Sequence, residues 1–151
     1  EDNARKINAT LEAINPAATQ DIIPLGRMDS MLQARDKLDE GYLVGMLADR
    51  GLGDDATVDC DFLGKPAPFP LGPFRMAAML RRPVFFMTGL YLGGNRYQLH
   101  FEPIADFSQT TREERDTAIH AAMQHYADRL THYCRLAPYN WFNFFDFWQK
   151  K

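Results

Sequence analysis

Apolar and polar positions along the chain predict helices and strands in alternation. Apolar residues recur at helical spacing over residues 3–14 and again from Met28 to Leu38, and the short run Asp21–Leu25 lies between them. Gly41 follows the second stripe, and glycine commonly ends a helix. We therefore expect helix, short strand and helix in this part of the chain.

The segment Tyr42–Ala48 is apolar throughout, and the polar turn Asp49-Arg50-Gly51 follows it at once. Continuous apolar character is typical of a strand that is buried on both faces of a parallel sheet. The sequence therefore predicts an α/β fold with a mixed, mainly parallel sheet flanked by helices.

Two segments follow with opposite backbone character. Residues Thr57–Leu63 alternate between apolar and polar side chains, as in a half-exposed strand. The stretch Gly64–Pro73 holds four prolines and two glycines, so it has few backbone donors and is expected to form a stiff surface loop. A helix is predicted from about Pro73, and Pro83 should end it.

The rest of the chain predicts a hairpin, a long helix and an aromatic tail. An apolar run after Pro83, the turn Gly93-Gly94-Asn95 and the alternating stretch Arg96–Glu102 indicate an antiparallel hairpin. Helical spacing then continues from Thr111 to Leu136. The tail Pro138–Trp148 has seven aromatics in eleven residues and no clear period. We expect a single domain over residues 1–151.

Composition narrows the class of protein. With 46% apolar residues and a net charge of −3 spread over mixed Lys, Arg, Asp and Glu, the chain is globular and no nucleic-acid partner is expected. Cys60 and Cys134 lie in apolar patterns, which favours buried, reduced thiols and a cytoplasmic location. The longest nearly apolar run, Pro83–Leu92, is too short to span a bilayer, so membrane contact would be peripheral, on the inner face of the cell membrane.

Three segments resemble a known family in their order: LADRG at 47–51, DFLGKPAPFPLGPFRMAAMLRRPVFF at 61–86, and APYNWFNFFDFW at 137–148. They resemble the C-terminal part of the bacterial acyltransferase superfamily that includes the lipid A and lysophospholipid acyltransferases, especially the forms sometimes fused to glycosyltransferases. The resemblance is clearest at the family's Phe-x-Gly-x-Pro-Ala loop, which Phe62, Gly64, Pro66 and Ala67 match.

The resemblance implies transfer of a fatty acyl group from acyl-CoA or acyl carrier protein, as co-substrate, to a hydroxyl of a lipid or glycolipid-type acceptor. No bound cofactor is implied. The family's catalytic His-x4-Asp/Glu motif is absent, because positions 105, 125, 130 and 137, five places after each histidine, hold Ala, His, Leu and Ala. We therefore expect this motif upstream, in an N-terminal half outside this chain. We also expect the chain alone to be catalytically inactive.

The candidate substrate-binding residues follow predicted strands. Asp49 and Arg50 come after the apolar segment, where α/β sheets place ligand crevices, and Arg50 could hold a phosphate or carboxylate. A surface turn closed by an Asp-Arg pair is the alternative. Phe69, Gly72 and Pro73 could form one wall of an acyl or acceptor groove, for which plain packing is the alternative. No metal site is predicted from the spacing of the histidines or aspartates.

Two further questions stay open in the sequence. The aromatic tail could enter a membrane interface, or Trp141, Phe144, Phe145 and Trp148 could hold it on the sheet. We expect packing for the majority of its rings, with one or two exposed. A half-domain would expose apolar surface and self-associate. A function of a different class is a non-catalytic binding or scaffolding domain derived from the same fold.

Overall fold

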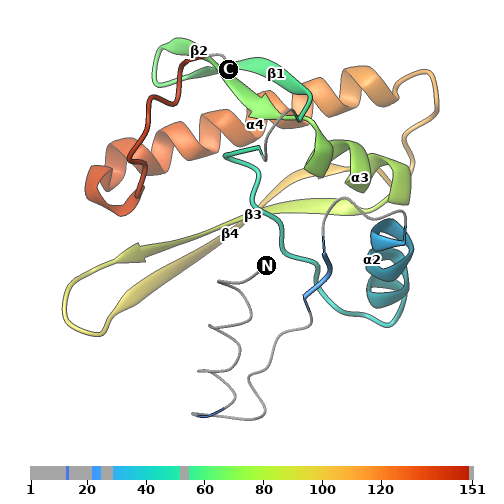
Figure 1. The fold of residues 1–151 in the computed structure, drawn as a ribbon, viewed down its shortest axis with the longest axis horizontal. Helices are drawn as coiled ribbons and strands as arrows, with labels where there is room; N and C mark the ends of the chain where they lie inside the picture. The colour runs from blue at the N-terminus through green and yellow to red at the C-terminus, as the bar shows by residue number, and fades with distance from the viewer. Residues whose placement is uncertain (1–12, 14–21, 25–28, 52–54, 150–151) are drawn as a thin grey trace. The chain divides into compact units, whose positions relative to one another are not determined.

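The structure, a computed structural model, describes residues 13, 22–24, 29–51 and 55–149 (Figure 1). The chain divides into two compact units, Glu1–Gly45 (unit 1) and Met46–Lys151 (unit 2). The helix predicted over 3–14 lies outside the described residues except for Ala13. Of the predicted strand Asp21–Leu25, residues 22–24 are described and belong to no strand.

Unit 1 contains helix α2 (Ser30–Asp39), which confirms the predicted second helix. The hydroxyl of Ser30 at its start donates a hydrogen bond to the carbonyl of Pro24. At its end, Gly41 has a φ of +89°, a conformation that glycine adopts without steric cost, and the N–H of Tyr42 donates to the carbonyl of Lys37 at 3.0 Å. The glycine therefore ends the helix as the sequence predicted.

The predicted buried strand Tyr42–Ala48 is wrong. In the described part of the chain this segment enters no ladder, and Leu43 and Leu47 are 90% and 75% exposed. A strand buried on both faces needs a neighbour on each side, but the four strands that are described each pair with their neighbour in sequence. The mainly parallel sheet is therefore wrong too. Over the described residues the fold is mixed α/β with two antiparallel two-stranded sheets.

The prediction of a loop at Lys65–Pro70 is also wrong, because this segment is strand β2 (Lys65–Pro70) and pairs with β1 (Thr57–Phe62). The turn has positive φ at Leu63 and Gly64, 52° and 88°, as a two-residue hairpin requires. Phe62 and Lys65 close the turn, so alternate residues of β2 donate towards β1. Pro66, Pro68 and Pro70 occupy the other positions, where no donor is needed.

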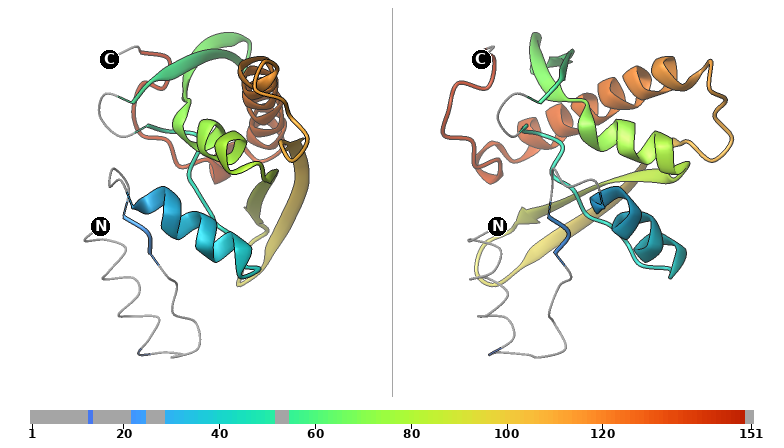
Figure 2. Two further views of the ribbon diagram at one scale, coloured as in Figure 1. Left: turned by 90° about the vertical axis from the view of Figure 1, so that its right-hand side faces the viewer. Right: turned by 45° about the vertical axis from the view of Figure 1, so that its right-hand side comes forward.

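Helix α3 (Gly72–Leu80) and the strands β3 (Pro83–Tyr91) and β4 (Tyr97–Asp106) confirm the predicted helix and hairpin. The long helix α4 (Arg115–Leu136) confirms the next prediction. It runs between the β1–β2 hairpin and the β3–β4 hairpin (Figures 1 and 2). Its apolar stripe therefore forms the centre of the core, with Met123 and Ala127 fully buried. No helix in the described ranges is both long and apolar enough to cross a bilayer.

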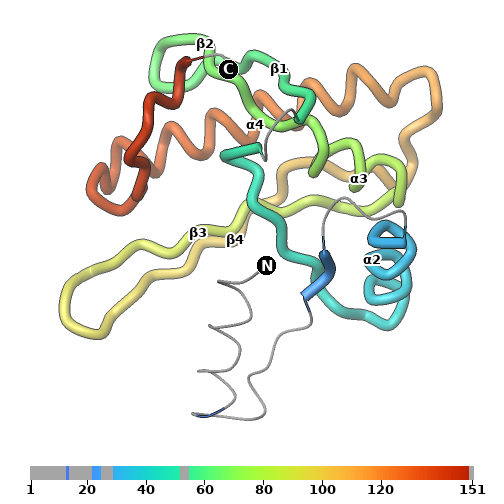
Figure 3. Tube along the Cα trace, viewed as in Figure 1, coloured from blue at the N-terminus to red at the C-terminus, as the bar shows by residue number. Residues whose placement is uncertain are grey.

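The tail packs only in part, which corrects the prediction that most of its rings would be buried. After the short 3-10 helix η2 (Pro138–Asn140) the chain turns back along α4 to the β1–β2 hairpin (Figure 3). Trp141, Phe147 and Trp148 pack against Phe62, with ring centroids 5.1, 5.2 and 5.8 Å from it. The other four rings are exposed, namely those of Tyr139, Phe142, Phe144 and Phe145.

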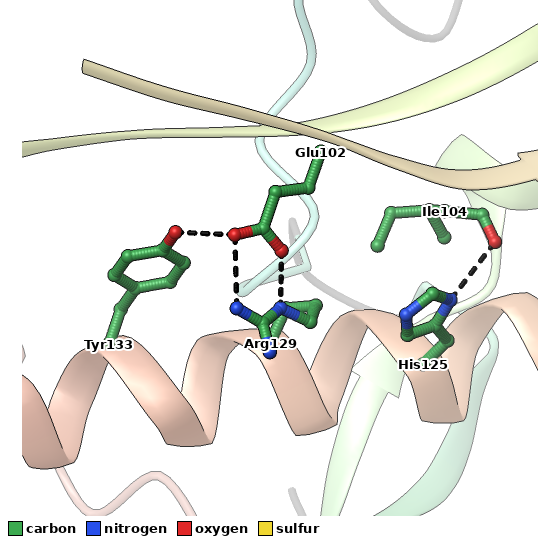
Figure 4. A network of polar contacts seen from close by, with 5 residues as sticks. All are labelled: Glu102, Ile104, His125, Arg129 and Tyr133. Carbon is green, nitrogen blue, oxygen red and sulfur yellow. Dashed lines mark hydrogen bonds and ion pairs between the residues drawn. The ribbon is translucent and has the colours of Figure 1, made fainter.

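The polar face of β4 meets α4 through one ion-pair network (Figure 4). Both nitrogens of the Arg129 fork donate to the Glu102 carboxylate, and the Tyr133 hydroxyl donates to it at 2.5 Å. These hydrogen bonds hold the pKa of Glu102 below its usual range. One turn away, the His125 ring lies 3.1 Å from the Ile104 carbonyl. This network fixes the hairpin onto the helix.

Candidate functional site

A pocket of about 620 Å³ lies at the start of unit 2, where the turn after the apolar segment meets β1, β2 and the tail. We call it the Asp49 pocket. Its lining residues are Asp49, Arg50, Gly51, Asp55, Thr57, Asp59, Pro68, Phe145, Asp146, Phe147 and Gln149.

Asp49 is a largely covered polar group of this pocket with two hydrogen-bond donors. Its side chain is 13% exposed, and its carboxylate accepts hydrogen bonds from Arg50 Nη2 at 3.1 Å and from Trp141 Nε1 at 3.4 Å. Arg50 is 44% exposed, so part of its guanidinium stays open to solvent. The pair closes a turn and also lines the pocket, whereas ligand binding by Arg50 stays a prediction.

Gly51 allows two parts of the pocket wall to approach closely. A Cβ atom on Gly51 would lie 3.3 Å from the Cβ and the Oδ2 of Asp55, and 3.7 Å from the Cβ of Pro70. A larger residue would have to push the Asp55 side chain aside. The glycine therefore sets the spacing between the Asp49 turn and the β1–β2 hairpin.

The charge of the pocket also acts on buried groups of unit 2. Burial, and secondarily the charge of Asp49, raises the pKa of the Cys134 thiol to about 11, and the same two causes raise the pKa of Tyr126. Burial and nearby aspartates raise the pKa of Cys60 to about 11. Both cysteines are free and buried, as the sequence predicted. At these pKa values the neutral thiol predominates near pH 7, which argues against either cysteine as a nucleophile.

The other predicted site residues do not line the pocket. Phe69 is fully buried, in edge contact with Phe62 and Tyr126 at 5.6 and 6.0 Å between ring centroids. Gly72 and Pro73 form the first turn of α3, directly beyond the end of β2.

The four histidines lie away from the Asp49 pocket. His120, His125 and His132 are exposed on α4, and the ring of His132 contacts that of Tyr133. His100 is half-buried under the β3–β4 hairpin, where its ring centroid is 4.9 Å from that of Tyr133. Within the described ranges, no group of three or more His, Cys, Asp or Glu side chains is placed to hold a metal ion.

A second pocket, of about 350 Å³, lies within unit 1 between residues 22–23 and α2. Its polar lining residues include Asp36 and Lys37, and these pair with Arg35 and Glu40 on the same helix. We assign no chemistry to this pocket, because its polar side chains are solvated helix residues.

Sequence reasoning missed most of the Asp49 pocket. The sequence predicted only a half-exposed strand over Thr57–Leu63 and a packing role for Phe145 in the tail. Asp55, Asp59, Phe145 and Phe147 come from segments about 90 residues apart, and only the fold brings them together. The one available signal was the polar face of β1, which carries Thr57 and Asp59 on alternate positions.

The family model of the bacterial lipid A biosynthesis acyltransferases matches residues 16–150 of the chain. No curated protein sequence matches. No solved structure matches either.

Proposed function

The chain belongs to the bacterial lipid A biosynthesis acyltransferase family, and from this premise we propose that it forms the substrate-binding part of a lipid O-acyltransferase. The donor would be acyl-CoA or acyl carrier protein, used as a co-substrate. The acceptor would be a hydroxyl of a lipid or glycolipid. Such an enzyme would act in the cytoplasm, at the inner face of the cell membrane.

The observation that supports this role is the junction at Asp49. The LADRG turn and the aromatic tail both lie within the matched region, and the Asp49 carboxylate accepts a hydrogen bond from the indole N–H of Trp141. This contact keeps Asp49 in one orientation at the pocket. Arg50 has a partly exposed guanidinium beside it. An arginine fork of this kind suits a phosphate or carboxylate of the donor or the acceptor.

The other lining residues suit a head group that carries hydroxyls. Carboxylate oxygens accept hydrogen bonds from hydroxyls, and four aspartates line the pocket with one arginine. The exposed ring of Phe145 and the neighbouring Pro68 offer apolar surface next to them. We propose that Gly72 and Pro73, which follow the buried Phe69 in sequence, border the acyl or acceptor groove.

In the proposed reaction the acceptor oxygen attacks the thioester carbonyl carbon, a C–O bond forms, and the C–S bond breaks. A general base must take the acceptor's proton, and the leaving thiolate is protonated as CoA or carrier-protein thiol. No histidine of the chain has the required acid five places later. We therefore propose that a His-x4-Asp/Glu motif upstream of these residues supplies the base, and that the chain alone is inactive.

The product of the complete gene tests the pocket assignment. Arg50→Gln should raise the KM for the acceptor or donor about tenfold with a smaller change in kcat, because a charged binding contact is lost. The matched control is Arg75→Gln, an exposed arginine on α3 outside the pocket. Equal kinetics for the two variants would remove Arg50 from the site.

The complete gene product also distinguishes the proposed enzyme from the alternative function, a non-catalytic domain. A non-catalytic binding or scaffolding domain would transfer no acyl group from any donor, even in the complete gene product. Self-association remains a prediction, and sedimentation of the purified chain measures it directly.

A further inference from the structure

The lining of the Asp49 pocket carries an excess of negative charge. Its described residues include four carboxylates and one guanidinium, those of Asp49, Asp55, Asp59 and Asp146 and that of Arg50. The carboxylates come from the turn, from β1 and the residue Asp55 before it, and from the tail, so more than one wall of the cavity is acidic. A cavity lined mainly by one sign of charge attracts groups of the opposite sign.

Arg50 contributes one positive charge against these four negative charges. Its guanidinium already lies 3.1 Å from the Asp49 carboxylate. The other three aspartates of the lining, Asp55, Asp59 and Asp146, are exposed residues. A ligand that brought only a phosphate or a carboxylate to Arg50 would be repelled by these three carboxylates. A ligand that also carries a cation would instead be attracted by them.

Two other groups of the lining have the same electrostatic preference. The ring of Phe145 is 53% exposed, and the face of an aromatic ring attracts cations. Pro68 has no N–H, and the register of the hairpin directs its carbonyl to the side of β2 away from β1. Carboxylates, a carbonyl and an aromatic ring are different kinds of group, and all three favour a positively charged hydrogen-bond donor.

The size and the apolar part of the pocket favour an organic cation over a metal ion. Its volume of about 620 Å³ is that of a small-molecule site, whereas a single water molecule occupies roughly 30 Å³. The rings of Phe145 and Pro68 offer apolar surface beside the carboxylates. The methylene groups of an amine can pack on such surface, but a metal ion requires oxygen, nitrogen or sulfur ligands. An alkylammonium group therefore matches both parts of the lining.

From these observations we propose that the Asp49 pocket binds a head group that carries an ammonium ion. This inference rests on the proposed function, which makes the ligand a lipid-type substrate, and it narrows the chemistry of that ligand. The ammonium donates hydrogen bonds to the carboxylates of Asp55, Asp59 and Asp146 and lies beside the ring of Phe145. An anionic group on the same molecule is then free to reach Arg50.

Titration of the whole chain with small probes tests the proposal. Ethanolamine and ethylene glycol have the same length, and an ammonium in the first replaces a hydroxyl in the second. Followed by NMR at constant ionic strength, ethanolamine should shift the signals of the lining residues. It should bind on the order of tenfold more tightly than ethylene glycol, because its hydrogen bonds to the carboxylates are between charged groups. Inorganic phosphate should leave these signals unchanged.

Two pairs of variants locate the bound cation. Asp59→Asn should weaken ethanolamine binding about fivefold, because one carboxylate becomes neutral without a change in size. The matched control Asp61→Asn changes an exposed residue two places along β1 that is not among the described lining residues, so its effect should be smaller. Phe145→Leu should weaken binding about threefold through loss of the ring. Phe142→Leu removes an exposed ring of the tail outside the lining and should leave binding unchanged.

The same spectra show whether each variant keeps its fold. If Asp59→Asn does not, Asp146→Asn takes its place, because an amide oxygen still accepts the hydrogen bond from the N–H of Trp148. The proposal is overturned if ethanolamine leaves the lining residues unshifted, or if ethylene glycol or phosphate binds there as tightly. It is also overturned if magnesium chloride shifts the same signals at lower concentration than ethanolamine, or if Asp59→Asn and Asp61→Asn weaken binding equally.

Probe binding and acyl transfer can fail separately. Acyl transfer by the complete gene product without ethanolamine binding by the chain would overturn this inference and leave the proposed function standing. Ethanolamine binding at the pocket without any acyl transfer would support the ammonium site and contradict the proposed function.

Discussion

The carboxylate of Asp49 accepts a hydrogen bond from the indole N–H of Trp141 at 3.4 Å, across 92 residues of sequence. It is the only polar contact described between the turn at the Asp49 pocket and the aromatic tail. Because Asp49 is only 13% exposed, the contact lies in a partly desolvated place. It therefore contributes both to the orientation of the pocket and to the attachment of the tail.

Trp141→Phe should destabilise the chain by about 1 kcal/mol, because the ring packing on Phe62 is kept and the donor to Asp49 is lost. The matched control is Trp148→Phe. The Nε1 of Trp148 is buried and has no hydrogen-bond partner among the described residues. Trp148→Phe should therefore lower the free energy of unfolding less than Trp141→Phe, or raise it. Urea unfolding of the two variants measures the difference. An equal loss would show that the Asp49 hydrogen bond contributes nothing.

Gly51→Ala should lower the free energy of unfolding by about 1 kcal/mol, since its Cβ would lie 3.3 Å from two atoms of Asp55. Gly45→Ala is the control, because a Cβ at that position meets nothing within 4 Å. It should be neutral or slightly stabilising. If thermal unfolding ranks the two variants in the opposite order, the close approach at Gly51 is not a packing constraint.

The stability that Glu102 contributes should depend on pH. Its folded pKa is lowered by Arg129 and Tyr133, so its contribution is complete above the usual glutamate pKa of about 4.3 and is lost as pH falls through the folded value. Glu102→Gln should therefore be less stable than wild type near neutral pH and should approach it in acid. The exposed Glu113→Gln is the control in the same titration. A difference that stays constant down to about pH 3 would contradict the network.

Cys60 and Cys134 should resist thiol reagents in the folded chain. Burial raises the pKa of both thiols to about 11, so the thiolate fraction near neutral pH is lower than that of a free cysteine by about a hundredfold. Ellman's reagent should react slowly with the native protein and rapidly in denaturant. Fast labelling of either cysteine without denaturant would contradict its burial.

The sequence predicted those elements that are stabilised by nearby residues. The apolar stripe of α4 and the alternation of β1 are visible in their own residues. Gly41 and Pro83 mark the ends of helices, because these residue types restrict or free the backbone locally. These predictions agree with the structure to within a few residues. Helix α4 begins at Arg115, four residues after the predicted start, because Glu114 and Thr111 hydrogen-bond each other in the preceding turn.

The errors arose where a tertiary partner decides the outcome. Tyr42–Ala48 has the composition of a buried strand, yet composition does not state which strand would pair with it. The prolines of β2 were counted as lost donors, although their alternation places every missing N–H on the side away from β1. The aromatic tail has no period, so its split between packed and exposed rings depended on the position of Phe62.

Of the candidate site, only Asp49 and Arg50 were placed at the pocket by sequence reasoning. They follow an apolar segment, a position that is recognisable in the sequence. Asp55, Phe145 and Asp146 reach the same pocket from the start and the end of unit 2. No spacing rule connects residues that far apart, so the fold was required to identify them.

Acyl transfer from a labelled acyl-CoA or acyl carrier protein to a lipid acceptor tests the central claim most directly. The assay compares the purified 151-residue chain with the complete gene product at equal concentration. We predict no turnover by the chain and turnover by the complete product, lost on replacement of an upstream His-x4-Asp/Glu histidine. Turnover by residues 1–151 alone would contradict the account, because the catalytic base would then lie among these residues.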